Sequence, residues 1–261
     1  MAIRSFFDQI GSQVSFTYPP ERIVSLVPSQ TELLADLGLE SQIVGVTKFC
    51  IHPNGLQQTK TIIGGTKNFL FDVIDDLKPD LIIGNKEENY IEGIEKLKKK
   101  YAVWLSDVVT LSDAYSMISS LGKLTNTEEK ALLIRNEITE RLQSVKRKPA
   151  CSVLYLIWRK PWMAVASATF INSILTMLNL KNVLENATRY PQLSTEQIAE
   201  LRPDLIFLSS EPYPFREEHV NELKKISPSS RIILVDGEMF SWYGSRLLKA
   251  ADYFNRLSLD G

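Results

Sequence analysis

Cysteine and histidine are scarce in this chain, with two residues of each among 261. Cys50 and Cys151 are too few for a disulfide framework, and their separation in sequence predicts two free thiols, which is typical of a reducing compartment. His52 and His219 cannot supply the clustered ligands of a structural zinc site, since Cys50-x-His52 is a pair only.

An excess of charge of either sign is also absent. Thirty basic residues stand against 31 acidic ones, so nothing favours binding to nucleic acid or to an anionic membrane. No apolar run approaches the roughly 20 residues that span a bilayer, so no membrane insertion is expected. The first residues, Met1–Asp8, lack the apolar core of a signal peptide, so we expect either a cytosolic protein or a leader that is not part of this sequence.

The motifs of common enzyme classes are missing as well. There is no Gly-x-Ser-x-Gly, Gly-x-Gly-x-x-Gly or Walker A pattern, so hydrolases, dinucleotide-binding enzymes and nucleotidases lack their usual anchors. Gly64-Gly65-Thr66-Lys67 resembles a phosphate-binding loop only loosely, because it lacks the second glycine-lysine spacing of such loops. We expect no catalytic residues and no intrinsic cofactor.

An internal repeat is the clearest positive feature. Residues 72–83 and 196–207 match position for position, 124 residues apart. Each copy predicts an amphipathic helix, then Lys/Arg-Pro-Asp, then a wholly apolar run typical of a strand buried on both faces of a parallel sheet. Chance recurrence of helix–Pro–Asp–strand junctions is the alternative, but matching upstream elements favour duplication.

Those upstream elements have the same order in both halves. Strands are expected over 22–27 and 151–157, helices over 31–37 and 170–178, and short strands over 43–46 and 182–184. Capping boxes are expected from Ser29 to Glu32 and from Ser194 to Gln197. The order predicts an α/β protein with two similar Rossmann-like lobes and mainly parallel sheets.

A helical segment is expected between the lobes. Thr127-Glu128-Glu129 begins a helix at its acidic end, and Arg141 and Lys146–Lys148 end it in agreement with the helix dipole. We therefore expect an N-terminal lobe over 1–111, a connecting segment over 112–148 built on one long helix, and a C-terminal lobe over 149–261. A helical connector predicts limited hinge opening.

Ligands of open parallel sheets bind beyond the carboxyl ends of the strands, and the residues there are unusually aromatic and polar. Three of the four tryptophans fall in these loops, which favours a ligand cleft over mere covering of the core edge. The candidate ligand-binding residues are Lys48, Phe49, His52, Lys67, Asn68, Lys86, Glu87, Glu88, Trp158, Trp162, Tyr190, Glu211, Tyr213, Phe215, Trp242 and Tyr243.

Other functions remain open from these residues. Cys50, His52 and Glu87 or Glu88 could instead serve a cytosolic metal-dependent enzyme or metallochaperone, although adjacent carboxylates diverge and no partner histidine lies near them in sequence. A cytosolic sensor that keeps the binding fold is a third reading. For the charged residues taken singly, a solvated surface position is the simpler interpretation.

Several ordered motifs carry a family resemblance. They are Asp8-x-x-Gly11-x-x-Val14, Pro20-x-Arg22-Ile23-Val24-Ser25-Leu26, Val44-Gly45-Val46, Gly64-Gly65 and Leu77-Lys78-Pro79-Asp80-Leu81. Together they resemble the solute-binding proteins of ABC importers for cobalamin, haem and iron–siderophores, and cobalamin-binding-like members most. The resemblance runs from about residue 8 to residue 257.

The resemblance implies two lobes joined by one long helix, and a monomer that binds cobalamin, haem or a ferric siderophore in the cleft between the lobes. It implies ABC permease subunits as partners. In the family an acidic residue on each lobe docks onto the permease, and Asp72 and Glu196 stand at the matching positions. It also implies a periplasmic location.

Overall fold

The computed structural model of the chain describes residues 2–259, which form two compact units. Unit 1 comprises the described residues up to Val108, together with Ser112–Thr139 and Tyr243–Arg246. Unit 2 comprises Val109–Leu111, Glu140–Trp242 and the described residues from Leu247 onward. The four residues Tyr243–Arg246 therefore belong to unit 1, although the chain on both sides of them belongs to unit 2.

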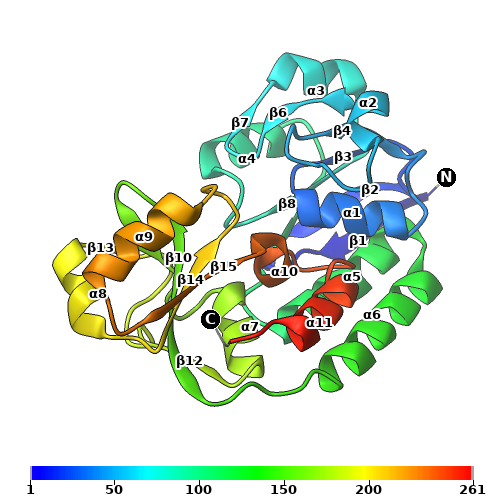
Figure 1. Ribbon diagram of the computed structural model, residues 1–261. Coiled ribbons are helices and arrows are strands. Elements are labelled where there is room, and N and C mark those ends of the chain that lie inside the picture. Colours follow the sequence, from blue (N-terminus) through cyan, green and yellow to red (C-terminus); the bar gives the residue numbers. More distant parts are fainter. Residues whose placement is uncertain (1, 260–261) are drawn as a thin grey trace. The chain divides into compact units, whose positions relative to one another are not determined.

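The centre of unit 1 is a parallel sheet with strand order β5-β4-β3-β8-β9 (Figure 1). Its strands are β3 (Ile23–Ser25), β4 (Ile43–Val46), β5 (Thr61–Ile62), β8 (Leu81–Asn85) and β9 (Val103–Ser106). Its helices are α1 (Pro28–Asp36), α2 (Leu56–Thr59), α3 (Phe71–Leu77) and α4 (Ile91–Lys98). Strands β8 and β9 are buried at every position, which explains their nearly continuous apolar sequences.

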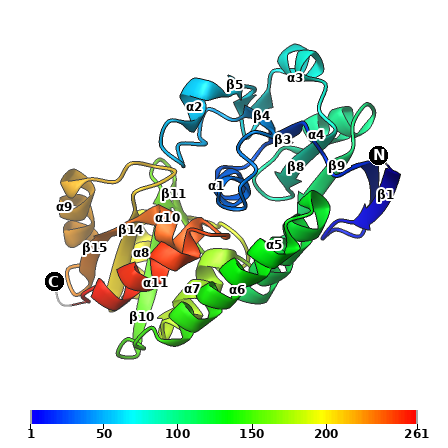
Figure 2. The ribbon, with the colours of Figure 1, turned by 90° about the vertical axis from the view of Figure 1, so that its right-hand side faces the viewer.

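Unit 1 also contains two antiparallel pairs. The first is an N-terminal hairpin of β1 (Ala2–Phe7) and β2 (Gln13–Tyr18), which Figure 2 shows alongside β9. Trp104 of β9 donates its indole N–H to the Phe7 carbonyl at 3.2 Å and so fixes the hairpin there. The second pair consists of β6 (Gly64–Gly65) and β7 (Asn68–Phe69).

The sheet of unit 2 has the order β13-β11-β10-β14-β15, with β12 also paired to β10. The strands are β10 (Cys151–Trp158), β11 (Trp162–Ala164), β12 (Leu180–Asn182), β13 (Gln192–Leu193), β14 (Leu205–Ser209) and β15 (Arg231–Val235). The helices are α7 (Phe170–Met177), α8 (Thr195–Leu201), α9 (Glu217–Ile226), α10 (Gly237–Ser241) and α11 (Leu247–Arg256). Within the described part of this sheet β11 runs antiparallel to both its neighbours, β10 and β13, and the other pairs are parallel, so the mainly parallel α/β fold is confirmed.

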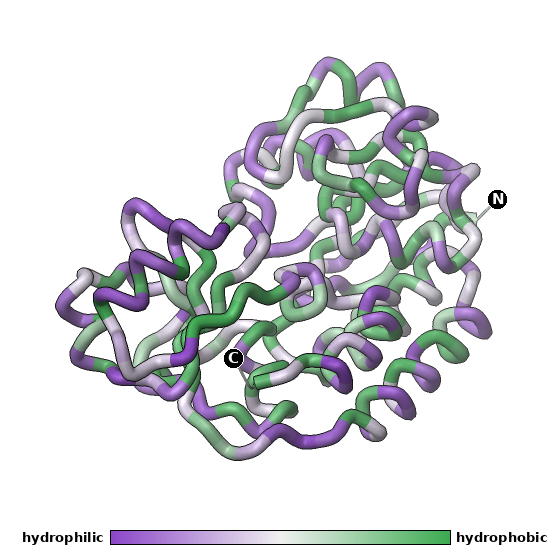
Figure 3. Tube along the Cα trace, viewed as in Figure 1, coloured by the Kyte–Doolittle hydropathy of each residue, from purple (hydrophilic) through white to green (hydrophobic). Residues whose placement is uncertain are grey.

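The helical segment expected between the lobes contains two helices, α5 (Leu111–Thr125) and α6 (Glu128–Gln143). Asn126 between them has a left-handed backbone with φ 59°. Helix α6 begins at the predicted acidic residues but ends before Lys146. Hydrophobic residues concentrate in the strands, while the helices alternate between polar and apolar residues (Figure 3). Within residues 2–259 no helix is long and apolar enough to cross a membrane.

The two copies of the repeat end their helices in the same way. Lys78 after α3 has φ 45° and Arg202 after α8 has φ 42°, so both adopt the left-handed conformation that favours glycine. The proline that follows each of them prevents the helix from continuing. The repeat is therefore one of backbone conformation as well as of sequence.

The aspartate of each copy also has an equivalent contact. The Asp80 carboxylate accepts the backbone N–H of Arg22, next to β3, at 2.9 Å. The Asp204 carboxylate accepts the backbone N–H of Ser152, in β10, at 2.7 Å, and this contact lowers the pKa of Asp204. In both copies the aspartate thus fixes the start of the neighbouring parallel strand, β3 or β10.

Glycine at these two positions is expected to stabilise the protein. Lys78→Gly and Arg202→Gly should each raise the free energy of unfolding by up to about 1 kcal/mol, because the left-handed backbone costs a non-glycine residue about 1–2 kcal/mol and the added freedom of glycine offsets part of that gain. Urea unfolding of the two variants measures the change. Lys99→Gly is the matched control: Lys99 ends α4 with φ −68°, so glycine there should destabilise the protein. Equal effects at all three positions would contradict the argument.

The two predicted capping boxes have different outcomes. The box from Ser194 to Gln197 is confirmed, with the serine hydroxyl and the glutamine carbonyl each accepting the other's backbone N–H. The box from Ser29 to Glu32 is wrong. Helix α1 begins at Pro28 with Val27 as its N-cap residue, so Ser29 lies within the first turn, and the Glu32 carboxylate forms an ion pair with Arg246.

Candidate ligand-binding loops

In unit 1 the loops at the carboxyl edge of the sheet present an exposed aromatic ring. Phe49 follows β4 and is 49% exposed, and its ring packs over the backbone of Gly65, where an added Cβ would lie 3.2 Å from the ring. The Lys48 ammonium lies 5.1 Å from the centre of that ring. A flat apolar surface with a cation beside it can stack against a planar or greasy ligand.

One buried amide joins three loops of this edge. The Asn89 carbonyl accepts the backbone N–H of Asn85 at 2.8 Å. Its amide nitrogen donates to the backbone carbonyls of Leu26 and Thr66, at 3.3 and 3.1 Å. The ends of β3 and β8 and the turn between β6 and β7 are therefore held by one side chain.

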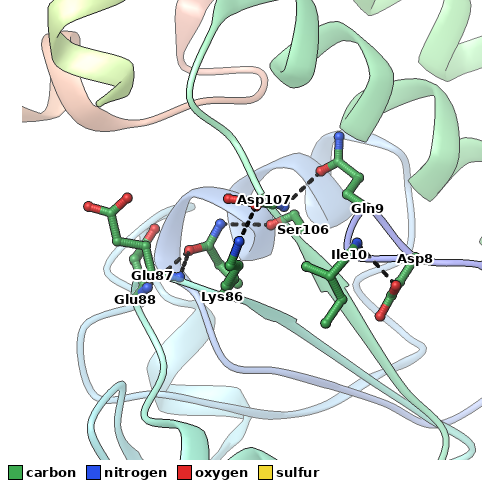
Figure 4. A network of polar contacts seen from close by, with 9 residues as sticks. Asp8, Gln9, Ile10, Lys86, Glu87, Glu88, Ser106 and Asp107 are labelled. Carbon is green, nitrogen blue, oxygen red and sulfur yellow. Dashed lines mark hydrogen bonds and ion pairs between the residues drawn. The ribbon is translucent and has the colours of Figure 1, made fainter. Parts of the chain in front are cut away.

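A second amide shapes the loop that carries the two adjacent glutamates. The Asn85 carbonyl accepts the backbone N–H groups of Glu87 and Glu88 at 2.8 and 2.9 Å. Its amide nitrogen donates to the Ser106 hydroxyl at 2.9 Å, which also accepts from Gln30 at 2.6 Å. Figure 4 shows both glutamates on one side of this network and Ser106 on the other. The loop is preorganised because its polar groups are already satisfied.

Two candidate lysines contribute to the same loop structure. Lys67 donates to the backbone carbonyl of Glu87 at 2.6 Å, which ties the β6–β7 turn to the loop after β8. Lys86 pairs with Asp107 at 2.6 Å and remains half exposed (Figure 4). The ammonium groups of Lys67 and Lys86 thus contact residues of the loops themselves. The side chains of Lys48 and Lys86 are exposed and so remain accessible to a ligand.

The cysteine proposed for a metal or nucleophile role is a core residue. Cys50 is completely buried, and its sulfur lies 3.1 Å from the Thr31 hydroxyl and 3.2 Å from the Thr47 hydroxyl. Burial raises the pKa of the Cys50 thiol, which favours the unreactive protonated form. Among residues 2–259 no group of three or more His, Cys, Asp or Glu residues is placed to hold a metal ion. Cys50 and Cys151 are both free thiols.

In unit 2 an aromatic cluster follows β10 and β14. Trp158 is 38% exposed and meets Tyr213 edge to face with ring centres 5.5 Å apart. Tyr213 contacts Phe215 at 4.8 Å, and Phe215 stacks on Trp162 at 6.2 Å. Trp162 and Phe215 are buried and support the cluster from within the unit, whereas the Trp158 ring is accessible to solvent.

Polar contacts of Arg159 and His219 hold this aromatic cluster in place. Arg159 lies 4.2 Å over the Trp162 ring and binds both carboxylate oxygens of Glu222, which raises the pKa of Arg159 and lowers that of Glu222. His219 accepts the backbone N–H of Arg216 at its Nδ1 and contacts the Tyr213 hydroxyl through Nε2, both at 3.0 Å. Sequence reasoning missed the roles of Glu222 and His219, because neither lies in a strand-end loop.

The remaining candidates divide by exposure. Lys67 and Asn68 are exposed, while His52, Glu87, Glu88, Tyr190, Glu211 and Tyr213 are partly buried. Trp162, Phe215, Trp242 and Tyr243 are buried. Asp72 and Glu196 are exposed in the first turns of α3 and α8, and hydrogen bonding to Ser194 lowers the pKa of Glu196.

Comparison with known proteins links the fold to one kind of protein. The sequence model described as periplasmic binding protein matches residues 23–226. The chain is 25% identical to the uncharacterized ABC transporter substrate-binding lipoprotein YvrC of Bacillus subtilis, over 94% of this chain and 82% of that protein. It is 26% identical to the vitamin B12-binding protein of Vibrio parahaemolyticus, over 73% of this chain and 71% of that protein.

Solved structures share the fold. The periplasmic vitamin B12-binding protein BtuF of Vibrio cholerae superposes with a TM-score of 0.77 at 20% identity, covering 91% of this chain and 96% of BtuF. The periplasmic heme-binding protein RhuT of Roseiflexus superposes with a TM-score of 0.76 at 19% identity, covering 90% of this chain and 98% of RhuT. At these identities the likeness concerns the fold.

Proposed function

This chain belongs to the periplasmic binding protein family, and from that premise we propose that it captures a corrinoid, haem or ferric siderophore for an ABC importer. The observation that carries the proposal is the accessible ring at the carboxyl edge of each sheet, Phe49 in unit 1 and Trp158 in unit 2. Large ligands with flat or apolar faces match such rings. The names of the relatives, which include vitamin B12-binding proteins, support the same ligand class. The cleft expected between the lobes stays a prediction.

Partner binding is the second part of the proposal. Asp72 and Glu196 occupy equivalent positions on α3 and α8, 124 residues apart, and both carboxylates face solvent. Paired acids on two equivalent helices suit cationic side chains of a two-subunit permease. No described feature favours the enzyme or metallochaperone alternative, since Cys50 is buried and the relatives are substrate-binding proteins.

Ligand titration tests the proposal. Cyanocobalamin, haemin and a ferric hydroxamate siderophore are titrated separately while tryptophan fluorescence is recorded, and one of them is expected to quench it. Phe49→Ala and Trp158→Ala should then weaken binding about tenfold each, because stacking and burial of a ring contribute about 1–2 kcal/mol. Phe7→Ala is the control, because this 71% exposed ring lies on the N-terminal hairpin. Absence of binding by all three compounds would overturn the ligand class.

A further inference from the structure

The loops after the two repeat strands are held by two residues that are adjacent in sequence. Trp242 donates its indole N–H to the Glu211 carboxylate at 2.9 Å, in the loop after β14. Tyr243 donates its hydroxyl to the Glu88 carboxylate at 2.5 Å, in the loop after β8. Each contact lies within one unit, the first in unit 2 and the second in unit 1. Strands β8 and β14 are the equivalent strands of the repeat.

The contact in unit 1 is firmly anchored. The Tyr243 side chain is buried, which together with the nearby Glu88 carboxylate raises the pKa of its hydroxyl. Gly244 follows with φ +134°, and an added Cβ there would lie 3.3 Å from the Ser29 carbonyl of α1. Arg246 then pairs with a buried glutamate of α1. The segment Tyr243–Arg246 is therefore held in unit 1 at its backbone and at both ends.

The contact in unit 2 is equally close. The Glu211 carboxylate accepts the Ser241 hydroxyl at 2.7 Å as well as the Trp242 indole, and burial raises the pKa of Glu211. An added Cβ on Gly237 would lie 2.4 Å from the Ser209 hydroxyl oxygen and 2.6 Å from Glu211 Cγ. Helix α10 and the loop after β14 thus pack with no space between them.

We propose that the Trp242-Tyr243 dipeptide is a staple that couples the loop after β8 to the loop after β14. A planar peptide bond holds the two Cα atoms about 3.8 Å apart, so neither residue can shift far alone. Each buried ring has two side-chain torsions and a hydrogen bond to a carboxylate, so a displacement of either loop is passed to the backbone of the dipeptide. Trp242 and Tyr243 are then positioning residues for loops that the proposed function assigns to the ligand.

Hydrogen exchange of the unliganded protein tests the coupling and needs no ligand, so its result is independent of the ligand titration. Tyr243→Phe removes only the hydroxyl, and Trp242→Phe removes only the indole donor. Each variant should speed amide exchange about tenfold in its own loop, 85–91 for Tyr243 and 209–215 for Trp242. Each should also speed exchange about two- to threefold in the other loop, which is the signature of coupling.

The matched control is Tyr101→Phe. It removes a hydroxyl that donates to the Asp75 carboxylate at 2.5 Å, a bond of the same kind in unit 1 but outside both loops, and it should change neither loop. Glu88→Ala breaks the Tyr243 contact from the loop side and replaces Tyr243→Phe if that variant does not fold. Faster exchange confined to the near loop, or unchanged exchange in both, would overturn the proposal.

Discussion

Replacement of Arg246 by leucine is expected to lower the free energy of unfolding by about 3–5 kcal/mol. Arg246 and Glu32 are only 5% and 4% exposed, and two guanidinium nitrogens lie 2.8 Å from the two carboxylate oxygens. The variant leaves the Glu32 charge buried without its cation, and removal of a buried charge from its partner is among the most destabilising single changes. Urea unfolding followed by circular dichroism measures the loss.

Two further variants separate the buried charge from other causes. Arg141→Leu removes an exposed pair with Asp252 at 3.5 Å and should cost less than about 0.5 kcal/mol. The double variant Glu32→Leu/Arg246→Leu removes both charges and should recover at least half of the single-variant loss, because two apolar side chains of similar size carry no desolvation penalty. A double variant less stable than Arg246→Leu would contradict this account.

Asn89→Leu is expected to cost about 2–4 kcal/mol in unfolding free energy. Leucine has the same branched shape and is somewhat larger, so no cavity forms, but the Asn85 N–H and the Leu26 and Thr66 carbonyls lose their partner. Unpaired buried polar groups each carry a penalty of about 1–3 kcal/mol, partly relieved where water can enter. Urea unfolding gives the magnitude, and hydrogen exchange should rise first in residues 64–68 and 85–91.

Asn54→Leu provides the control for that change. Asn54 is exposed in unit 1, so the same substitution there should alter stability by no more than about 0.5 kcal/mol. If both variants had the same stability, the loops of unit 1 would be held by something other than the Asn89 amide.

Local patterns in the sequence predict much of the fold. The repeat over 72–83 and 196–207 is periodic and short-range, and the structure confirms it down to the left-handed Lys78 and Arg202. The wholly apolar runs 81–83 and 205–207 lie in β8 and β14 inside parallel sheets, as expected from the absence of polar alternation. Such features are predictable because the residues that determine them are neighbours in sequence.

Contacts between distant residues could not be predicted in the same way. The Ser29–Glu32 spacing fits a capping box as well as Ser194–Gln197 does, but Glu32 pairs with Arg246, 214 residues away. Strand-end position alone also cannot separate an accessible Trp158 from a buried Trp162. Burial depends on which rings stack beneath a loop, and that is a property of the assembled unit.

The membership of residues 243–246 in unit 1 has a consequence for synthesis of the chain. Glu32 leaves the ribosome 214 residues before its cation, Arg246. At about 5–20 residues per second, Glu32 is synthesised roughly 10–40 s before this partner. During that interval the final packing of α1 lacks the Arg246 guanidinium that pairs with Glu32. Unit 1 can therefore reach its final packing only after Arg246 has been synthesised, although most of its residues precede residue 140.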